Sequence, residues 1–295
     1  MLSKSDLVSA NRQSFLRMAG VSSLGAAAAA VAATGPVKLE AQSTRPGFQF
    51  DTPTQILTAA LIAEDLATTF YYNALVGKVV QDPNLADPGG TAAAPNPTGG
   101  NVPNLNYVQA ALTEEIAHAT LLRTLLGSSS APTDPVQTFY FPAGTFDILF
   151  STTGASFLTI LDALENAFIG AYLNAVRGFS YMAAQTSTNR GVYYPLNYST
   201  LTSDQLGYYA EVAASIMGVE AEHRALGRVI SVTNPANNVC YEQTDGLNGV
   251  YNGASAVAAL TPFLSSSNGA GYSLATALAG QAAVTLPCTG GIPAV

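Results

Sequence analysis

Only two histidines occur in the chain, and each lies three residues after a glutamate. The pairs are Glu115 with His118 and Glu220 with His223. On an α-helix, side chains three residues apart are neighbours, with Cβ atoms roughly 5–6 Å apart, so each pair turns a carboxylate and an imidazole to one side. The spacing therefore predicts two helices that each present this pair of groups, and two such pairs could bind two metal ions.

Four segments of the chain have the apolar spacing of a long helix. Thr52 and Pro53 are typical of a helix start, and Thr202 with Gln205 forms a capping box. Gly127 ends the second segment. Each segment is long enough to span a helical bundle. The predicted helices are Pro53–Val80, Leu105–Leu126, Ser156–Ala184 and Ser203–Ser231.

The two predicted helices without histidine each carry one glutamate within an apolar stripe. These are Glu64 in the first helix and Glu165 in the third. The four glutamates of the helices are separated by 51, 50 and 55 residues, which indicates one helical hairpin, Glu followed by Glu-x-x-His, used twice. Such a repeat places the four carboxylates at a common height.

Four carboxylates buried without basic partners would repel one another and take up protons, because burial and like charge both raise the pKa of an acid. Two divalent cations would neutralise them. Oxygen and imidazole ligands without thiolate suit iron or manganese, whereas zinc sites more often recruit cysteine. We therefore expect two metal ions, with iron as the first choice and manganese as the alternative.

The connections between the helices differ in kind. Residues 127–155 contain the β-favouring run Thr138–Phe141 and are long enough to cross the whole bundle. After the fourth helix the chain becomes rich in Asn, Gly and Ser, with apolar runs at 254–264 and 274–283 that could form short helices. We expect an irregular C-terminal extension over residues 232–295.

The N-terminus has the layout of an export signal over residues 1–41. Basic residues, among them Lys4 and Arg17, precede an uncharged, alanine-rich run, with cleavage expected after Ala33 or Ala41. Residues 11–17 resemble the twin-arginine export motif, with Gln in place of the second arginine. We expect a periplasmic, extracellular or cell-envelope protein with no stable transmembrane anchor after cleavage; the alternative is an uncleaved amphiphilic anchor.

Over about Pro53–Ser231 the chain resembles the ferritin-like superfamily of di-iron carboxylate proteins, whose bundles use this ligand set. The resemblance implies an all-α fold: a ferritin-like four-helix bundle over residues 50–231, with a long crossover between its second and third helices. The Phe-x-Phe-Pro-x-Gly-Thr-Phe run at Phe139–Phe146 and the exported, extended chain look most like ferritin-like proteins related to plant desiccation-related proteins.

The resemblance also implies how the ligands would divide between two iron ions. Glu115 and Glu220 would bridge the two ions. One metal would be bound by Glu64, Glu115 and His118, and the other by Glu165, Glu220 and His223.

Three acidic residues lie directly beside proposed ligands in the sequence. Asp65, Glu114 and Glu222 point about 100° or more around the helix from a ligand. We therefore expect them to be solvated surface charges outside the site.

Other polar residues lie one or two turns from a ligand glutamate. Tyr71 and Tyr172, each seven residues after such a glutamate, are either core residues or hydrogen-bond donors to the site. Asp162 either orients a histidine through its second ring nitrogen or is exposed.

Composition excludes several other classes of protein. The formal net charge is −8 and the pI about 4.6, with no cluster of Lys and Arg, so we expect no nucleic-acid partner. Cys240 and Cys288 lie outside any CxxC spacing, which excludes a zinc ribbon and a thioredoxin motif, although an oxidising compartment would permit one disulfide.

Three functions are consistent with these features. The first is iron oxidation, or stress protection that depends on oxygen or peroxide, at a di-iron site. The second is a structural or desiccation-protective envelope protein whose metal site only stabilises the bundle or is empty. The third is peroxide disproportionation at a manganese pair, as in manganese catalases. The sequence leaves a homo-oligomer open, whereas the long loops and tail disfavour a hollow storage shell.

Overall fold

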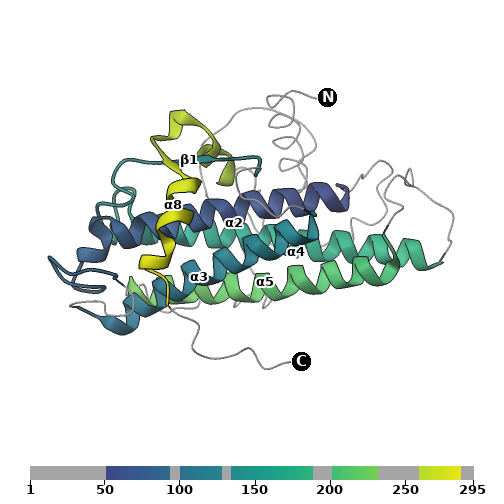
Figure 1. The fold of residues 1–295 in the computed structure, drawn as a ribbon, viewed down its shortest axis with the longest axis horizontal. Helices are drawn as coiled ribbons and strands as arrows, with labels where there is room; N and C mark the ends of the chain where they lie inside the picture. The colour runs from purple at the N-terminus through teal and green to yellow at the C-terminus, as the bar shows by residue number, and fades with distance from the viewer. Residues whose placement is uncertain (1–50, 94–99, 128–133, 189–200, 232–258, 287–295) are drawn as a thin grey trace, which may run out of the picture.

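Four long helices form the body of the molecule (Figure 1). The computed structural model describes residues 51–93, 100–127, 134–188, 201–231 and 259–286. Among these residues, no helix is long and apolar enough to cross a membrane. The four helices are α2 (Pro53–Val76), α3 (Val102–Leu125), α4 (Phe157–Thr188) and α5 (Ser203–Ile230).

The helix ends follow the signals in the sequence. Thr52 caps α2 in a capping box with Gln55, and Thr202 caps α5 in the same way with Gln205. The turn after α3 reaches Gly127, whose φ of 71° is a left-handed conformation that glycine adopts without a Cβ clash. The first helix ends earlier than predicted, at Val76, and a short 3-10 turn, η2 (Lys78–Gln81), follows it.

The four helices form two antiparallel hairpins, α2 with α3 and α4 with α5 (Figure 1). Leu122, late in α3, packs in the same apolar cluster as Ile56 near the start of α2. Phe157, which begins α4, instead stacks on Phe70 late in α2, with ring centroids 4.9 Å apart. The chain therefore returns along the bundle between α3 and α4, which confirms the predicted long crossover and the ferritin-like topology.

Two apolar clusters fill the bundle. One contains Phe70 and Phe157 and lies toward the end where α4 begins, while the other contains Ile56 and Leu122 and lies toward the opposite end. Each cluster includes one buried tyrosine, Tyr71 or Tyr172, that is in hydrogen-bond contact with a buried glutamate. The polar layer of the bundle is thus enclosed by apolar side chains on both sides.

A small sheet joins the crossover to the C-terminal segment. The predicted β-favouring run is strand β1 (Thr138–Phe141), which pairs antiparallel with β2 (Ala270–Ser273). Helix α8 (Leu274–Gly280) follows β2 and packs against α2, as Figure 1 shows, and the 3-10 turns are η5 (Thr261–Leu264), η6 (Ser266–Asn268) and η7 (Gln281–Ala283). Helix α8 with η7 coincides with the apolar run at 274–283, and η5 lies within the run at 254–264, so short helices form where the sequence allowed them.

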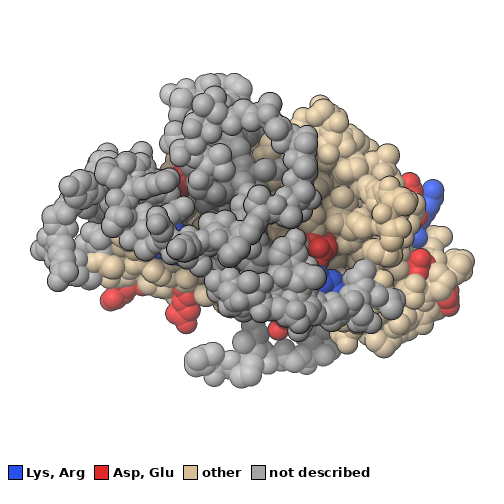
Figure 2. Space-filling view, turned by 180° about the vertical axis from the view of Figure 1, so that it is seen from behind, with Lys and Arg blue, Asp and Glu red and all other residues tan. Residues whose placement is uncertain are grey.

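Some sequence predictions concern residues outside those that the structure describes. The export signal, Cys240 and Cys288 are among them, so signal and disulfide stay predictions. On the described surface in Figure 2, acidic and basic side chains are scattered and form no single charged patch on that face.

Candidate metal centre

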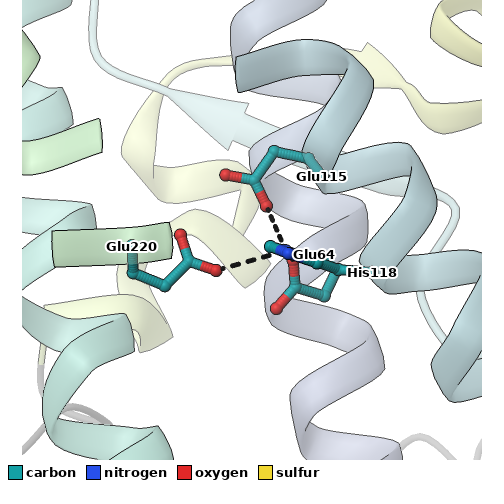
Figure 3. A group of neighbouring side chains, drawn as sticks. All are labelled: Glu64, Glu115, His118 and Glu220. Atoms are coloured by element: carbon teal, nitrogen blue, oxygen red, sulfur yellow. Dashed lines mark hydrogen bonds and ion pairs between the residues drawn. The ribbon is translucent and has the colours of Figure 1, made fainter. Parts of the chain in front are cut away.

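All six residues predicted as metal ligands meet in the middle of the bundle. Their ligand atoms form two groups, and within each group the atoms lie within 4.8 Å of one another. Glu115 and Glu220 belong to both groups, which is the arrangement that two bridging carboxylates would need. The first group is Glu64, Glu115, His118 and Glu220 (Figure 3); the second is Glu115, Glu165, Glu220 and His223.

His118 faces the first group through one ring nitrogen. Its Nδ1 lies 3.2 Å from Oε2 of Glu64, 3.7 Å from Oε2 of Glu115 and 3.5 Å from Oε1 of Glu220. Figure 3 shows these carboxylates approaching the imidazole from three different helices. The side chain of His118 is 12% exposed, whereas the three carboxylates are at most 2% exposed.

His223 faces the second group in the same way. Its Nδ1 lies 3.1 Å from Oε1 of Glu115, 3.3 Å from Oε2 of Glu220 and 3.8 Å from Oε1 of Glu165. The other ring nitrogen, Nε2, lies 2.8 Å from Oε2 of Glu114. A carboxylate on the outer nitrogen fixes the orientation of an imidazole and leaves its inner nitrogen for a metal. The side chain of Glu114 is 47% exposed, as expected for a solvated charge, but it also contacts His223, which its position on the helix did not predict.

Each of the two tyrosines binds a glutamate of the opposite hairpin. The hydroxyl of Tyr71 donates a hydrogen bond of 2.6 Å to Oε1 of Glu165, and the hydroxyl of Tyr172 donates to Oε1 of Glu64. Both tyrosines are buried in the apolar clusters, so the two roles considered for them, core residue and donor to the site, occur together. Each hydrogen bond engages one oxygen of a carboxylate; the second oxygen of Glu64 faces His118, and that of Glu165 has no hydrogen-bond partner among the described residues.

Many of the inner atoms have no hydrogen-bond partner among the described residues. They are both carboxylate oxygens of Glu115 and of Glu220, Oε2 of Glu165, and Nδ1 of His223, whose close contacts lack hydrogen-bond alignment. A buried polar atom without a partner costs about 1–3 kcal/mol. A set of such atoms, all facing one another, fits the binding of hard or borderline divalent cations such as iron or manganese.

The electrostatics of the cluster lead to the same conclusion. Burial, followed by the charge of Glu220, raises the pKa of Glu64 and of Glu165 well above the ordinary value for glutamate. Burial alone would also raise the pKa of Glu115, but its close contacts with the imidazoles of His118 and His223 lower that pKa below the ordinary range. Without cations, the site must therefore hold protons on some carboxylates and on its imidazoles, and cations would displace those protons.

The neighbouring carboxylates favour the protonated form of both histidines. Burial alone would lower the pKa of His118, but the charge of Glu64 and contacts with neighbouring carboxylates raise it well above the ordinary value. The pKa of His223 is likewise raised against the effect of burial, first by the hydrogen bond with Glu114. Both rings would have to release a proton from Nδ1 to bind a metal.

The structure also corrects the prediction for Asp65. This side chain is 1% exposed, and Oδ1 lies 2.5 Å from Nη2 of Arg123. The same guanidinium nitrogen lies 2.8 Å from Oδ2 of Asp134 in the crossover. Asp65 is thus part of a buried ion triad and is not a surface charge. Arg123, in the last turn of α3, is the signal that could have indicated a buried acidic partner.

Two other predictions for flanking acids have clear outcomes. Asp162 pairs with Arg228, with 2.8 Å between Oδ1 and Nε, so it does not orient a histidine. The Asp162 side chain is 41% exposed, which agrees with the alternative prediction of an exposed position. Glu222 is exposed, as predicted.

Comparison with known proteins identifies the class of the fold. A family model described as the ferritin-like domain matches residues 52–188, which span α2, α3, the crossover and α4. Neither a curated protein nor a solved structure matches the chain. Residues 52–188 therefore form a ferritin-like domain. Helix α5, with Glu220 and His223, follows the matched residues and completes the bundle, and the narrower resemblance to desiccation-related proteins stays a prediction.

Proposed function

We propose that the buried cluster binds two metal ions, iron first and manganese as the alternative. The observation that carries this proposal is a set of inward-facing atoms that have no hydrogen-bond partner within the described part of the chain; they belong to Glu115, Glu165, Glu220 and His223. Two overlapping ligand groups that share two glutamates support the proposed number of ions. A set of oxygen and imidazole donors without thiolate favours iron or manganese.

The side chains of the cluster have separate tasks in this proposal. Glu115 and Glu220 would bridge the ions, while Glu64 and Glu165 would each bind one ion through the oxygen that its tyrosine leaves free. Nδ1 of each histidine would complete the set. The apolar clusters on both sides exclude water, which strengthens every electrostatic interaction within the layer.

A pair of iron ions supplies electrons that can pass to oxygen or peroxide. We therefore propose iron oxidation, or a reaction with oxygen or peroxide that protects against stress, as the activity of the site. Two readings compete with it: a manganese pair that disproportionates peroxide, and a metal pair that only stabilises the bundle. A purely structural role has its own support, because the ligands come from all four helices and a bound metal pair would hold these helices together.

Metal content is the first measurement. The mature chain, purified without chelators, is expected to contain about two iron or manganese ions. A variant with Ala at Glu115, His118, Glu220 and His223 should lose both ions, and Glu222→Gln, which changes a nearby exposed carboxylate, should keep them. A wild-type chain that stays metal-free after incubation with Fe²⁺ or Mn²⁺ would contradict the proposal.

Activity assays then separate the three readings. Oxidation of added Fe²⁺, or consumption of peroxide with a reductant, supports the iron reading, whereas peroxide disproportionation by the manganese form supports the second. A structural site should give no turnover in either assay, although loss of a ligand should lower the melting temperature of the loaded protein.

Export from the cytoplasm is a separate part of the proposal. Its support is the sequence alone, in which Arg12 and Arg17 precede the uncharged run. Expression of the full chain in a bacterium, followed by fractionation and N-terminal sequencing, should give a periplasmic product that begins near residue 34 or 42. A full-length product retained in the membrane would instead support the uncleaved anchor.

A further inference from the structure

The two Glu-x-x-His helices match at every ligand, but they differ at the residue just before the glutamate. In α3 this residue is Glu114, and in α5 the corresponding residue is Val219. Glu114 reaches from α3 to Nε2 of His223 on α5. A valine at the corresponding position can offer His118 no such contact, because its side chain has no polar atom.

The environments of the two histidines differ accordingly. The side chain of His223 is 1% exposed and has carboxylates at both ring nitrogens. The side chain of His118 is 12% exposed, and its ion-pair contacts within the described residues all involve Nδ1. In the described part of the chain, the imidazole of His223 therefore has partners on both sides, whereas that of His118 has partners only on its inner side and is nearer to solvent.

We propose that Glu114 is a positioning residue that makes the two metal positions unequal. The position at His223 binds its ion tightly, and the position at His118 is the weaker and more accessible one, where the second ion exchanges and small reactants approach. This inference rests on the proposed metal function. Its physical basis is that a carboxylate on the outer nitrogen orients a ligating imidazole and increases its basicity, and loss of such a partner typically costs 10–100-fold in metal affinity.

Titration with Co²⁺ tests the inequality directly. Calorimetry on the metal-free full chain should resolve two classes of site in the wild type. Glu114→Ala should weaken the tighter class by about 10–100-fold and leave the weaker class nearly unchanged. Glu114→Gln, which keeps a hydrogen-bond acceptor, should restore part of the loss. Glu222→Gln is the matched control, because it removes another carboxylate beside His223 that is exposed, and it should change neither class.

The reverse substitution tests the other half of the proposal. Val219→Glu should strengthen the weaker class, because it supplies the carboxylate that α5 lacks. The inference is overturned if Glu114→Ala leaves the affinity of the tighter class unchanged or weakens both classes equally. It is also overturned if Val219→Glu leaves the affinity of the weaker class unchanged. A wild type that binds no Co²⁺, Fe²⁺ or Mn²⁺ would contradict the proposed function itself, which is a different outcome.

A second readout needs no metal. Because the chain has only two histidines, acylation by diethyl pyrocarbonate can be assigned by mass spectrometry of an untagged chain. In the metal-free protein His118 should be modified before His223, and Glu114→Ala should reduce the difference. Equal rates in the wild type, or faster modification of His223, would overturn the assignment of the accessible position.

Discussion

The two hairpins agree inside the bundle and differ outside it. Within the cluster, each hairpin provides a terminal glutamate, a shared glutamate, a histidine and a tyrosine that binds the opposite hairpin. Outside it, Arg123 of the first hairpin is in a buried triad with Asp65 and Asp134, whereas Arg228, at the corresponding position of the second, pairs with the partly exposed Asp162. The inner carboxylates and imidazoles of the two hairpins therefore match residue for residue, whereas the surroundings of each hairpin determine the outer residues.

The largest expected effect is a difference in metal content between variants of the shared glutamates and variants of the terminal ones. Glu115→Ala or Glu220→Ala should remove nearly all bound metal, because each residue belongs to both ligand groups. Glu64→Ala or Glu165→Ala should leave about one ion per chain, because each belongs to one group only. Elemental analysis after dialysis checks the stoichiometry. Equal loss in all four variants would contradict the distinction between shared and terminal ligands.

The next effect compares the two outer arginines. Arg123→Met should lower the free energy of unfolding by about 3–5 kcal/mol, because it leaves Asp65 and Asp134 buried without their cation. Arg228→Met should cost only about 1 kcal/mol or less, since its partner is partly solvated. Urea unfolding of both variants measures the difference. Similar losses would show that burial of the triad is energetically unimportant.

The tyrosine pair should behave symmetrically. Tyr71→Phe and Tyr172→Phe should each destabilise the metal-free protein by about 1–3 kcal/mol, because each removes the donor to a buried carboxylate. Tyr72→Phe serves as a control on the same helix, since Tyr72 is only partly buried. Denaturant unfolding of the three variants provides the comparison, and markedly unequal losses for the first two would break the match between the hairpins.

The smallest expected effect is a change in pH dependence. Glu64 and Glu165 have raised pKa values in the folded state, so the folded protein holds more protons there than the unfolded chain does. Their contribution is present below the ordinary pKa of 4.5 and is lost as the pH rises through the raised values. Thermal unfolding of the metal-free protein should therefore show stability falling above this pH. Glu64→Gln and Glu165→Gln should each flatten the slope by at most about 1.4 kcal/mol per pH unit.

The inner residues could be predicted from sequence because they follow a local rule. A glutamate three residues before each histidine already defines a helical face, and the repeat places Glu64 and Glu165 at the same height. The outer residues obey no local rule. Asp65 is buried only because Arg123 and Asp134 come from a different helix and from the crossover, and Glu114 contacts a histidine on another helix. Helical position alone therefore missed the burial of Asp65 and the contact that the exposed Glu114 makes with His223.

The sequence predicted only one of the two strands of the small sheet, because the pairing depends on residues far apart in the chain. The β-favouring composition of Thr138–Phe141 indicated a strand, but a strand needs a partner, and β2 lies about 130 residues further along the chain. Its own sequence, Ala-Gly-Tyr-Ser, has little β-propensity. The pairing depends on where the crossover and the C-terminal segment meet against α2, which only the folded structure shows.

The pairing of β1 with β2 has a consequence for biosynthesis. Because β1 emerges from the ribosome well before its partner, its backbone donors and acceptors stay unpaired until nearly the whole chain has been made. The four helices can assemble from contacts closer in sequence, so closure of this sheet should be a late and comparatively slow step. A chain that is cut short before Ala270 would keep its ligands but expose a phenylalanine-rich strand edge, which is the type of surface on which nascent proteins aggregate.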